Sequence, residues 1–167
     1  MTLFFAYALT GCERASDSEA PEADAAASSE PVGDYTIVPE TGEVRATHTD
    51  TAGVTTSLRA GDTIKAELPA PFTVYPDAAV SYGTQVQRGD GTSATIEFDT
   101  PDSVNDVVAF YRKQAADAQI TPNVEVTGGD TTTLAGTNRR GGTSFALQAT
   151  RGQNGTRGLL SVESGFE

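Results

Sequence analysis

The amino-acid sequence predicts a domain of the α+β class, in which one helix packs on an antiparallel β-sheet. From about residue 35 the chain alternates apolar and polar residues in short, Thr-rich stretches separated by glycine turns, a pattern typical of strands. Only residues 100–119 have apolar residues at helical spacing. Because strand-like stretches lie on both sides of this segment, we expect hairpins before the helix and a meander after it.

Two hairpins are expected before the helix. They are residues 43–49 and 54–59 around the turn 50–53, and residues 78–87 and 92–99 around the turn 88–91. Three prolines lie in the segment 68–76 between the hairpins, and proline cannot donate a hydrogen bond within a central strand. We therefore expect this segment to be extended and to lay Leu68, Phe72 and Tyr75 over one end of the core.

The helix is expected to begin just after Thr100. This residue is a suitable N-cap, Pro101 suits the first helical position, and Asp102 and Asp106 would lie near the positive end of the helix dipole. One apolar stripe would face the sheet, and it consists of Val104, Val107, Val108, Tyr111, Ala115 and Ala118.

Four strands are expected after the helix. They are residues 123–127, 131–137, 143–150 and 157–163, with turns at Gly128-Gly129, Gly141-Gly142 and Asn154-Gly155. The side chains expected to point into the core are Val124, Val126, Leu134, Phe145, Leu147, Leu160 and Val162. The whole of residues 35–167 is thus expected to form a single domain.

The composition argues against several classes of function. The chain has 11 Lys and Arg against 23 Asp and Glu, a net charge of −12, which repels nucleic-acid phosphates and anionic lipid headgroups. Nucleic-acid binding is therefore not expected, and any attachment to a membrane needs another cause. One cysteine excludes an internal disulfide and a cysteine-clustered metal site. We expect neither a metal nor another cofactor.

The start of the chain has the pattern of an exported protein. An apolar stretch, residues 3–9, is followed by Leu9-Thr10-Gly11-Cys12, and the next 22 residues are rich in Ala, Ser, Glu and Pro. These four residues resemble the lipobox of bacterial lipoproteins. The resemblance implies that residues 1–11 are a signal peptide, that Cys12 carries lipid, palmitate included, and that residues 12–34 are a disordered acidic tether.

Two features bear on that resemblance. No Lys or Arg precedes the apolar stretch, which leads us to expect that the natural start lies upstream of Met1. The alternative is a cytoplasmic protein whose apolar start arises by chance.

The resemblance implies attachment to a membrane of the cell envelope, with the domain facing the periplasm. Glu13 follows the cysteine in place of the Asp of the simplest inner-membrane retention signal, which favours the outer membrane.

No set of residues forms a recognisable catalytic site, so we do not expect an enzyme. His48 is the only histidine, and no Ser or Cys nucleophile with a recognisable context accompanies it. Asp99, Asp102 and Asp106 lack the spacing of a calcium loop, and helix capping explains them better. Four arginines near the C-terminus could form an anion-binding patch, although solvated turn charges are the simpler interpretation. They are Arg139, Arg140, Arg151 and Arg157.

Three functions are compatible with these observations. The first is a non-enzymatic interaction or envelope-maintenance module that binds another envelope protein. The second is a small-ligand-binding protein, with a candidate groove between helix and sheet near Phe72, Tyr75 and Tyr111. The third is a hydrolase with His48 as general base. Tyr75-Pro76-Asp77-Ala78 and Phe110-Tyr111-Arg112 faintly resemble small uncharacterised lipoprotein domains, a resemblance that implies no activity.

Overall fold

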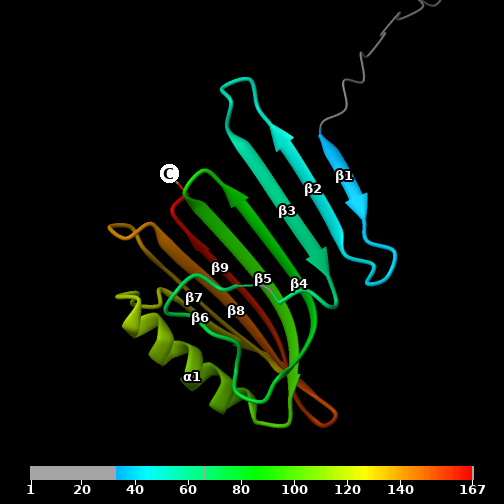
Figure 1. Ribbon diagram of the computed structural model, residues 1–167. Coiled ribbons are helices and arrows are strands. Elements are labelled where there is room, and N and C mark those ends of the chain that lie inside the picture. Colours follow the sequence, from blue (N-terminus) through cyan, green and yellow to red (C-terminus); the bar gives the residue numbers. More distant parts are fainter. Residues whose placement is uncertain (1–32, 66, 167) are drawn as a thin grey trace, which may run out of the picture. The chain divides into compact units, whose positions relative to one another are not determined.

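The computed structural model describes residues 33–65 and 67–166. The expected signal peptide, Cys12 and all but the end of the tether lie outside the described residues. The rest forms a nine-stranded antiparallel sheet and one helix (Figure 1). The strands are β1 (Asp34–Ile37), β2 (Val44–Thr49), β3 (Thr55–Gly61), β4 (Ala79–Arg88), β5 (Gly91–Thr100), β6 (Val124–Gly128), β7 (Thr131–Asn138), β8 (Thr143–Gly152) and β9 (Gly155–Ser164), and the helix is α1 (Val104–Asp117).

The strand order is β1-β2-β3-β4-β5-β9-β8-β7-β6. Every pair is antiparallel, and all but one join neighbours in the chain. The exception is β5 with β9, in which Ile96 lies opposite Leu160. This pairing joins the five strands before the helix to the four after it (Figure 1).

The expected α+β class, one helix on an antiparallel sheet with hairpins before the helix and a meander after it, is therefore wrong. The described chain is mostly β, with nine strands in one sheet against one helix of 14 residues. Local patterns identify hairpin partners, but they carry no signal for a pairing between strands about sixty residues apart. The physical requirement is clear in the structure, because β5 is largely buried and needs hydrogen-bond partners along both of its edges.

The core lies on the face of the sheet that α1 covers, which we call the inner face. The helix packs against β7, β8 and β9. Its buried side chains include Val107, Tyr111 and Ala115, as the apolar stripe predicted. The sheet contributes alternate residues to the same core, which are Ile96, Phe98, Leu134, Phe145, Leu147, Ala149, Leu160 and Val162.

The segment between β3 and β4 also lies on the inner face. We call it the crossing segment; it comprises residues 62–65 and 67–78, and it runs over the sheet in Figure 1. Phe72 and Tyr75 are buried and Leu68 packs against the core, which confirms the expected role of these three residues. Two hydrogen bonds tie the segment to the helix. Thr73 N donates to Gln114 Oε1 at 3.0 Å, and Gln114 Nε2 donates to Thr73 Oγ1 at 2.7 Å.

The helix begins three residues later than expected. Ser103 is the N-cap: its Oγ accepts a hydrogen bond from Asp106 N and donates one to Asp106 Oδ2. Thr100 is instead the last residue of β5, where it pairs with Thr156. The strand therefore continues through the residue that would otherwise cap the helix, and the Ser-x-x-Asp pattern supplies the cap.

Two expected core residues lie on the opposite face, which we call the outer face. Val124 is 41 % exposed and Val126 is 61 % exposed. They pair with Ala135 and Thr133 on β7, whose neighbour Leu134 points inward. Because side chains alternate along a strand, this register puts both valines on the outer face.

The strand β1 was also not predicted, because it is short and its Tyr35 and Ile37 are largely exposed.

Candidate functional site

The structure brings Tyr75 and Tyr111 of the predicted groove together. Their ring centroids lie 6.5 Å apart, and Tyr75 stacks on Phe98 at 6.4 Å. Phe72 lies against Phe145 on β8, at 5.2 Å. The three predicted residues are at most 7 % exposed, so they fill the space between helix and sheet in this structure.

The two tyrosine hydroxyls of this cluster differ in their environment. The Tyr75 hydroxyl donates to Asp102 Oδ2, and this hydrogen bond, aided by burial, raises the pKa of Tyr75 to about 12. The Tyr111 hydroxyl is fully buried; the backbone N–H of Tyr75 lies close enough to lower its pKa but does not meet hydrogen-bond distance and angle, and no other described group does. Burial raises the pKa of Tyr111 as well. A buried polar group without a well-formed hydrogen bond costs up to about 1–3 kcal/mol, which makes this hydroxyl a candidate contact for a ligand.

A polar pocket of about 160 Å³ lies farther along the inner face. It is lined by Ser57, Arg59, Glu67, Gln85 and Gln87. Four of these residues come from the paired strands β3 and β4, in which Arg59 lies opposite Gln85 and Ser57 opposite Gln87. The fifth, Glu67, comes from the crossing segment.

A buried carboxylate orients the arginine of this pocket. Glu43 accepts two hydrogen bonds from Arg45, at 3.0 and 3.1 Å, and one from Arg59 Nε at 2.7 Å. The bonds from Arg45 and then those from Arg59 lower the pKa of Glu43 to about 2. The Glu43 side chain is only 8 % exposed, whereas those of Arg45 and Arg59 are 57 % and 47 % exposed. Within the described part of the chain, the terminal nitrogens of Arg59 have no partner.

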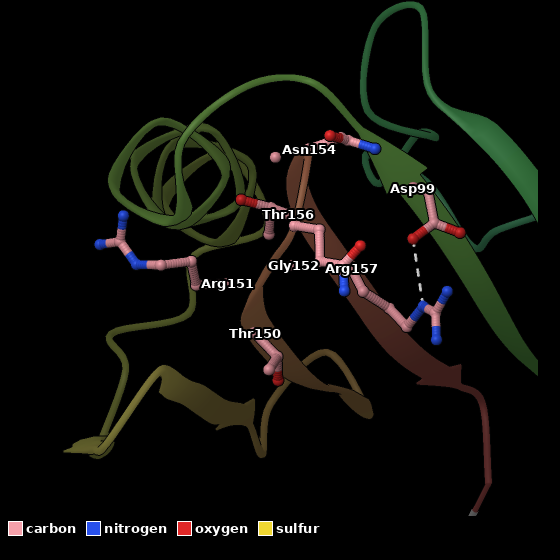
Figure 2. Close-up of a pocket in the computed structure, with 9 residues that line it drawn as sticks. Asp99, Thr150, Arg151, Gly152, Asn154, Thr156 and Arg157 are labelled. Carbon is pink, nitrogen blue, oxygen red and sulfur yellow. Dashed lines mark hydrogen bonds and ion pairs between the residues drawn. The ribbon is translucent and has the colours of Figure 1, made fainter.

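The four arginines near the C-terminus do not form one patch. Arg139 and Arg140 lie in the turn before β8, whereas Arg151 and Arg157 lie around the turn after it. A ten-residue strand spans about 33 Å, so the two pairs lie at opposite ends of the sheet. Figure 2 shows the hollow at the second end, where Arg157 Nε donates to Asp99 Oδ1 at 3.1 Å and Arg151 points the other way.

The remaining candidate residues are not assembled into a site. His48 is exposed on β2, and it makes no hydrogen bond to any described carboxylate or hydroxyl group. Asp99, Asp102 and Asp106 each have a separate partner, in Arg157, Tyr75 and Ser103. Within residues 33–65 and 67–166, no cluster of three His, Cys, Asp or Glu residues could hold a metal. No helix in these ranges is long and apolar enough to span a bilayer.

Sequence reasoning missed the polar pocket. Its residues are ordinary strand and loop polar side chains, and only the register of β3 against β4 brings them together. Alternation along β4 places Gln85 on the inner face, a position where an apolar residue is the rule. A glutamine at an inward-facing position can be recognised as unusual only when it is known which residues of β4 point inward.

Comparison with known proteins gives one match. Residues 80–156 match a family model described as START domain-like, which makes this part of the chain similar to that family. The matched region runs from β4 to the beginning of β9 and contains α1, Gln85 and Tyr111. Neither the curated proteins nor the solved structures include a match to this chain. The family match is compatible with a ligand-binding domain.

Proposed function

We propose that this protein binds a small, mostly apolar ligand between α1 and the inner face of the sheet, at Phe72, Tyr75 and Tyr111. The observation that carries the proposal is the fully buried Tyr111 hydroxyl, which forms no hydrogen bond of ordinary distance and angle with any described residue. The match of residues 80–156 to a START domain-like model supports the same class of function.

The surroundings of Tyr111 indicate the chemistry of the ligand. The neighbouring side chains Phe98 and Val107 are apolar and fully buried, so the body of the ligand would be apolar. A single hydroxyl or carbonyl group on the ligand would bond to the Tyr111 hydroxyl, which can either donate or accept. Binding would remove the cost of leaving that group unpaired.

The ligand needs room that the side chains now fill, and the crossing segment is the element that could make it. The segment carries Phe72 and Tyr75 into the core. It is tied down by the bonds of Thr73 to Gln114 and of Tyr75 to Asp102. Outward movement of the segment would break these bonds, at on the order of 1–3 kcal/mol each, and would expose Phe72 and Tyr75, so burial of the ligand has to offset that cost.

We further propose that a lipid on Cys12 anchors the protein to a membrane of the bacterial envelope, with the outer membrane preferred. The support is the lipobox resemblance and the composition of residues 13–34. These 22 residues reach at most about 75 Å when extended. The ligand-binding domain would thus stay close to the bilayer, where apolar ligands are concentrated.

The ligand-binding proposal is tested with the full chain carrying Cys12→Ser, incubated with an envelope lipid extract and analysed by native mass spectrometry. We expect a bound molecule with the wild-type core and at least tenfold weaker retention with Tyr111→Phe, equivalent to about 1.4 kcal/mol. Tyr82→Phe is the matched control, because Tyr82 is 43 % exposed. If no molecule is retained, or if Tyr111→Phe retains it equally well, the proposal is wrong.

A second candidate function is binding of another envelope protein by the outer face. The observation that favours it is a hollow of about 460 Å³, lined mainly by apolar atoms and including Tyr35, Ala46, His48 and Leu58. Tyr35 is 74 % exposed and Ile37 is 55 % exposed, which is unusual for large apolar side chains. A photo-crosslinker at position 35 should capture one defined envelope protein, whereas the same group at Glu97 should not. Equal capture at both positions would contradict this function.

A further inference from the structure

We propose that the domain pairs with a second copy of itself through β1, so that the two sheets become continuous. The interface shares no residue with the Tyr111 cluster, and the inference therefore goes beyond the ligand-binding function and does not depend on it. It competes with the second candidate function, in which the outer face near Tyr35 binds a different protein.

The strand β1 has an open edge at the margin of the sheet (Figure 1). It pairs with β2 on one side, and no strand of the described chain lies on its other side. All four of its residues are exposed. The free N–H and C=O groups of such an edge can pair with another strand. The outer-face side chains of β1 are Tyr35 and Ile37, so this edge is apolar as well as open.

The opposite edge of the sheet carries a charge that opposes pairing. The outermost strand there is β6, in which Glu125 lies opposite Leu134 and therefore on the inner face. Glu125 accepts a 2.6 Å hydrogen bond from Arg112 of α1. An inward-pointing charge on an edge strand is a device that prevents edge-to-edge association. In β1 the middle of the strand is Thr36, and its one charged residue, Asp34, stands at the beginning. Of the two open edges, β1 is thus the better suited to pair.

The sequence of β1 is self-complementary around Thr36. Opposite residues of antiparallel strands lie on the same face, so a two-fold axis perpendicular to the sheet has to pass between two identical residues. If Thr36 lies opposite Thr36 of the second copy, Tyr35 lies opposite Ile37 on the outer face, and the reverse pair forms by symmetry. Such a contact uses the same surface on both copies and closes at two copies.

This register would join two apolar rows that now end at β1. Both rows run across the outer face in the observed register, one through Tyr35, Ala46, Leu58 and Val86, the other through Ile37, Val44 and Ala60. Because Tyr35 of one copy would lie beside Ile37 of the other, each row would continue into the complementary row of the second copy. Pairing would therefore bury the exposed end of each row.

The charge of β1 favours the same register. The chain has a net charge of −12, so two copies pair only if their charges at the interface lie well apart. With Thr36 at the centre, four residues separate the two Asp34 carboxylates, about 14 Å along the strand. This distance exceeds the screening length of ~8 Å in physiological salt. A register centred on Tyr35 would bring the two carboxylates within about 7 Å of each other along the strand.

The test is disulfide trapping, which detects association through an interface as small as one short strand. Thr36→Cys is introduced into the full chain with Cys12→Ser, where it is the single cysteine. Opposite Cα atoms of antiparallel strands lie about 4.5–5.5 Å apart, within the span of a disulfide. Under air oxidation with copper–phenanthroline, a linked dimer should form roughly tenfold faster than with Thr127→Cys, the matched control on the exposed edge strand β6.

A lysine on the outer face of the edge should prevent the pairing. Ile37→Lys, added to Thr36→Cys, should slow trapping roughly tenfold, because a charged edge residue opposes strand association. Val126→Lys is its control, since Val126 has a similar exposure on the outer face of β6, and it should not slow trapping. Both side chains are exposed, so neither variant should lower Tm.

The outcomes separate this inference from both proposed functions. Equal trapping at positions 36 and 127, or trapping that Ile37→Lys leaves unchanged, would overturn it. A photo-crosslinker at position 35 should give a product with the mass of two copies of the chain. A product with a different protein and none with a second copy would overturn the dimer and support the second candidate function. Tyr111→Phe should leave trapping unchanged, so failure of the groove proposal would not affect this result.

Discussion

The Tyr75 hydroxyl donates a 2.6 Å hydrogen bond to Asp102 Oδ2, which joins the crossing segment to the residues just before α1. Asp102 is held from the other side as well, because its carbonyl oxygen accepts a hydrogen bond from Thr156 Oγ1 at 2.7 Å. The crossing segment, the approach to the helix and the beginning of β9 thus meet at one residue. This junction explains why the segment stays on the inner face despite its lack of regular structure.

Removal of the Tyr75 hydroxyl should destabilise the domain. A hydrogen bond to a charged group contributes about 1.5–3 kcal/mol, so Tyr75→Phe should lower the free energy of unfolding by about that amount. Urea denaturation followed by circular dichroism would measure the change. A stability equal to that of the wild type would show that the bond is not formed in solution.

Removal of the Tyr111 hydroxyl should have the opposite effect. Tyr111→Phe also deletes a hydroxyl oxygen, but the Tyr111 hydroxyl is buried without a well-formed hydrogen bond, so this variant should raise the free energy of unfolding by about 1 kcal/mol. Thermal denaturation of the ligand-free protein would measure the shift. A marked loss of stability would indicate that the hydroxyl is bonded in the free protein and would remove the main support for the groove.

The pH dependence of stability should include a contribution from Glu43. The folded protein holds the pKa of Glu43 at about 2, below its ordinary value of 4.5. Stability from this group is therefore present above pH 4.5 and is lost as the pH falls from 4.5 toward 2. Glu43→Gln should flatten the decline of the urea midpoint in that range. An unchanged profile would contradict the Arg45–Glu43–Arg59 arrangement.

Alanine substitutions at Gly158, which faces the core, and at Gly128, which does not, provide a matched test of core packing. A Cβ atom at Gly158 would overlap the buried ring of Phe98, so Gly158→Ala should cost about 1–3 kcal/mol or more. No atom lies within 4 Å of a Cβ at Gly128, and Gly128→Ala should change stability by less than about 0.5 kcal/mol. Chemical denaturation of both variants measures the difference. Equal effects would contradict the register of β9 against β5.

The lipid anchor makes a prediction that needs no structure. Cells given radiolabelled palmitate should label the wild-type protein, and Cys12→Ser should abolish the label because Cys12 is the only cysteine of the chain. Membrane fractionation should show loss of attachment in the same variant. A protein purified from its native cells with an unmodified Met1 and a free thiol would contradict the envelope assignment.

Sequence patterns located the turns of this fold better than its overall arrangement. Gly128-Gly129, Gly141-Gly142 and Asn154-Gly155 all lie at the turns that join paired strands, because glycine supplies the backbone conformations that tight turns require. The pairing of β5 with β9 could not be predicted, since it depends on which buried strand edges remain after the local hairpins have formed. That single pairing decided the class of the fold.

The candidate sites likewise contain some features that local sequence patterns predict and others that depend on distant elements. The apolar positions Tyr75 and Tyr111 were placed together correctly, because both follow from the requirement for a core next to the helix. The bond between Tyr75 and Asp102 and the burial of Gln85 could not be predicted, since each depends on the side-chain positions of distant elements. Side chains without an apolar pattern have no periodic signal, and the polar pocket consists entirely of such residues.

The central position of β9 has a consequence for biosynthesis. Of the nine described strands β9 is synthesised last, and it lies between β5 and β8, so a growing chain can assemble hairpins but has no complete sheet until β9 has emerged. Until then the exposed edges of β5 and β8 are open to pairing with other chains. Loss of β9 alone would therefore remove a hydrogen-bonded partner from both β5 and β8 and open the sheet at its centre.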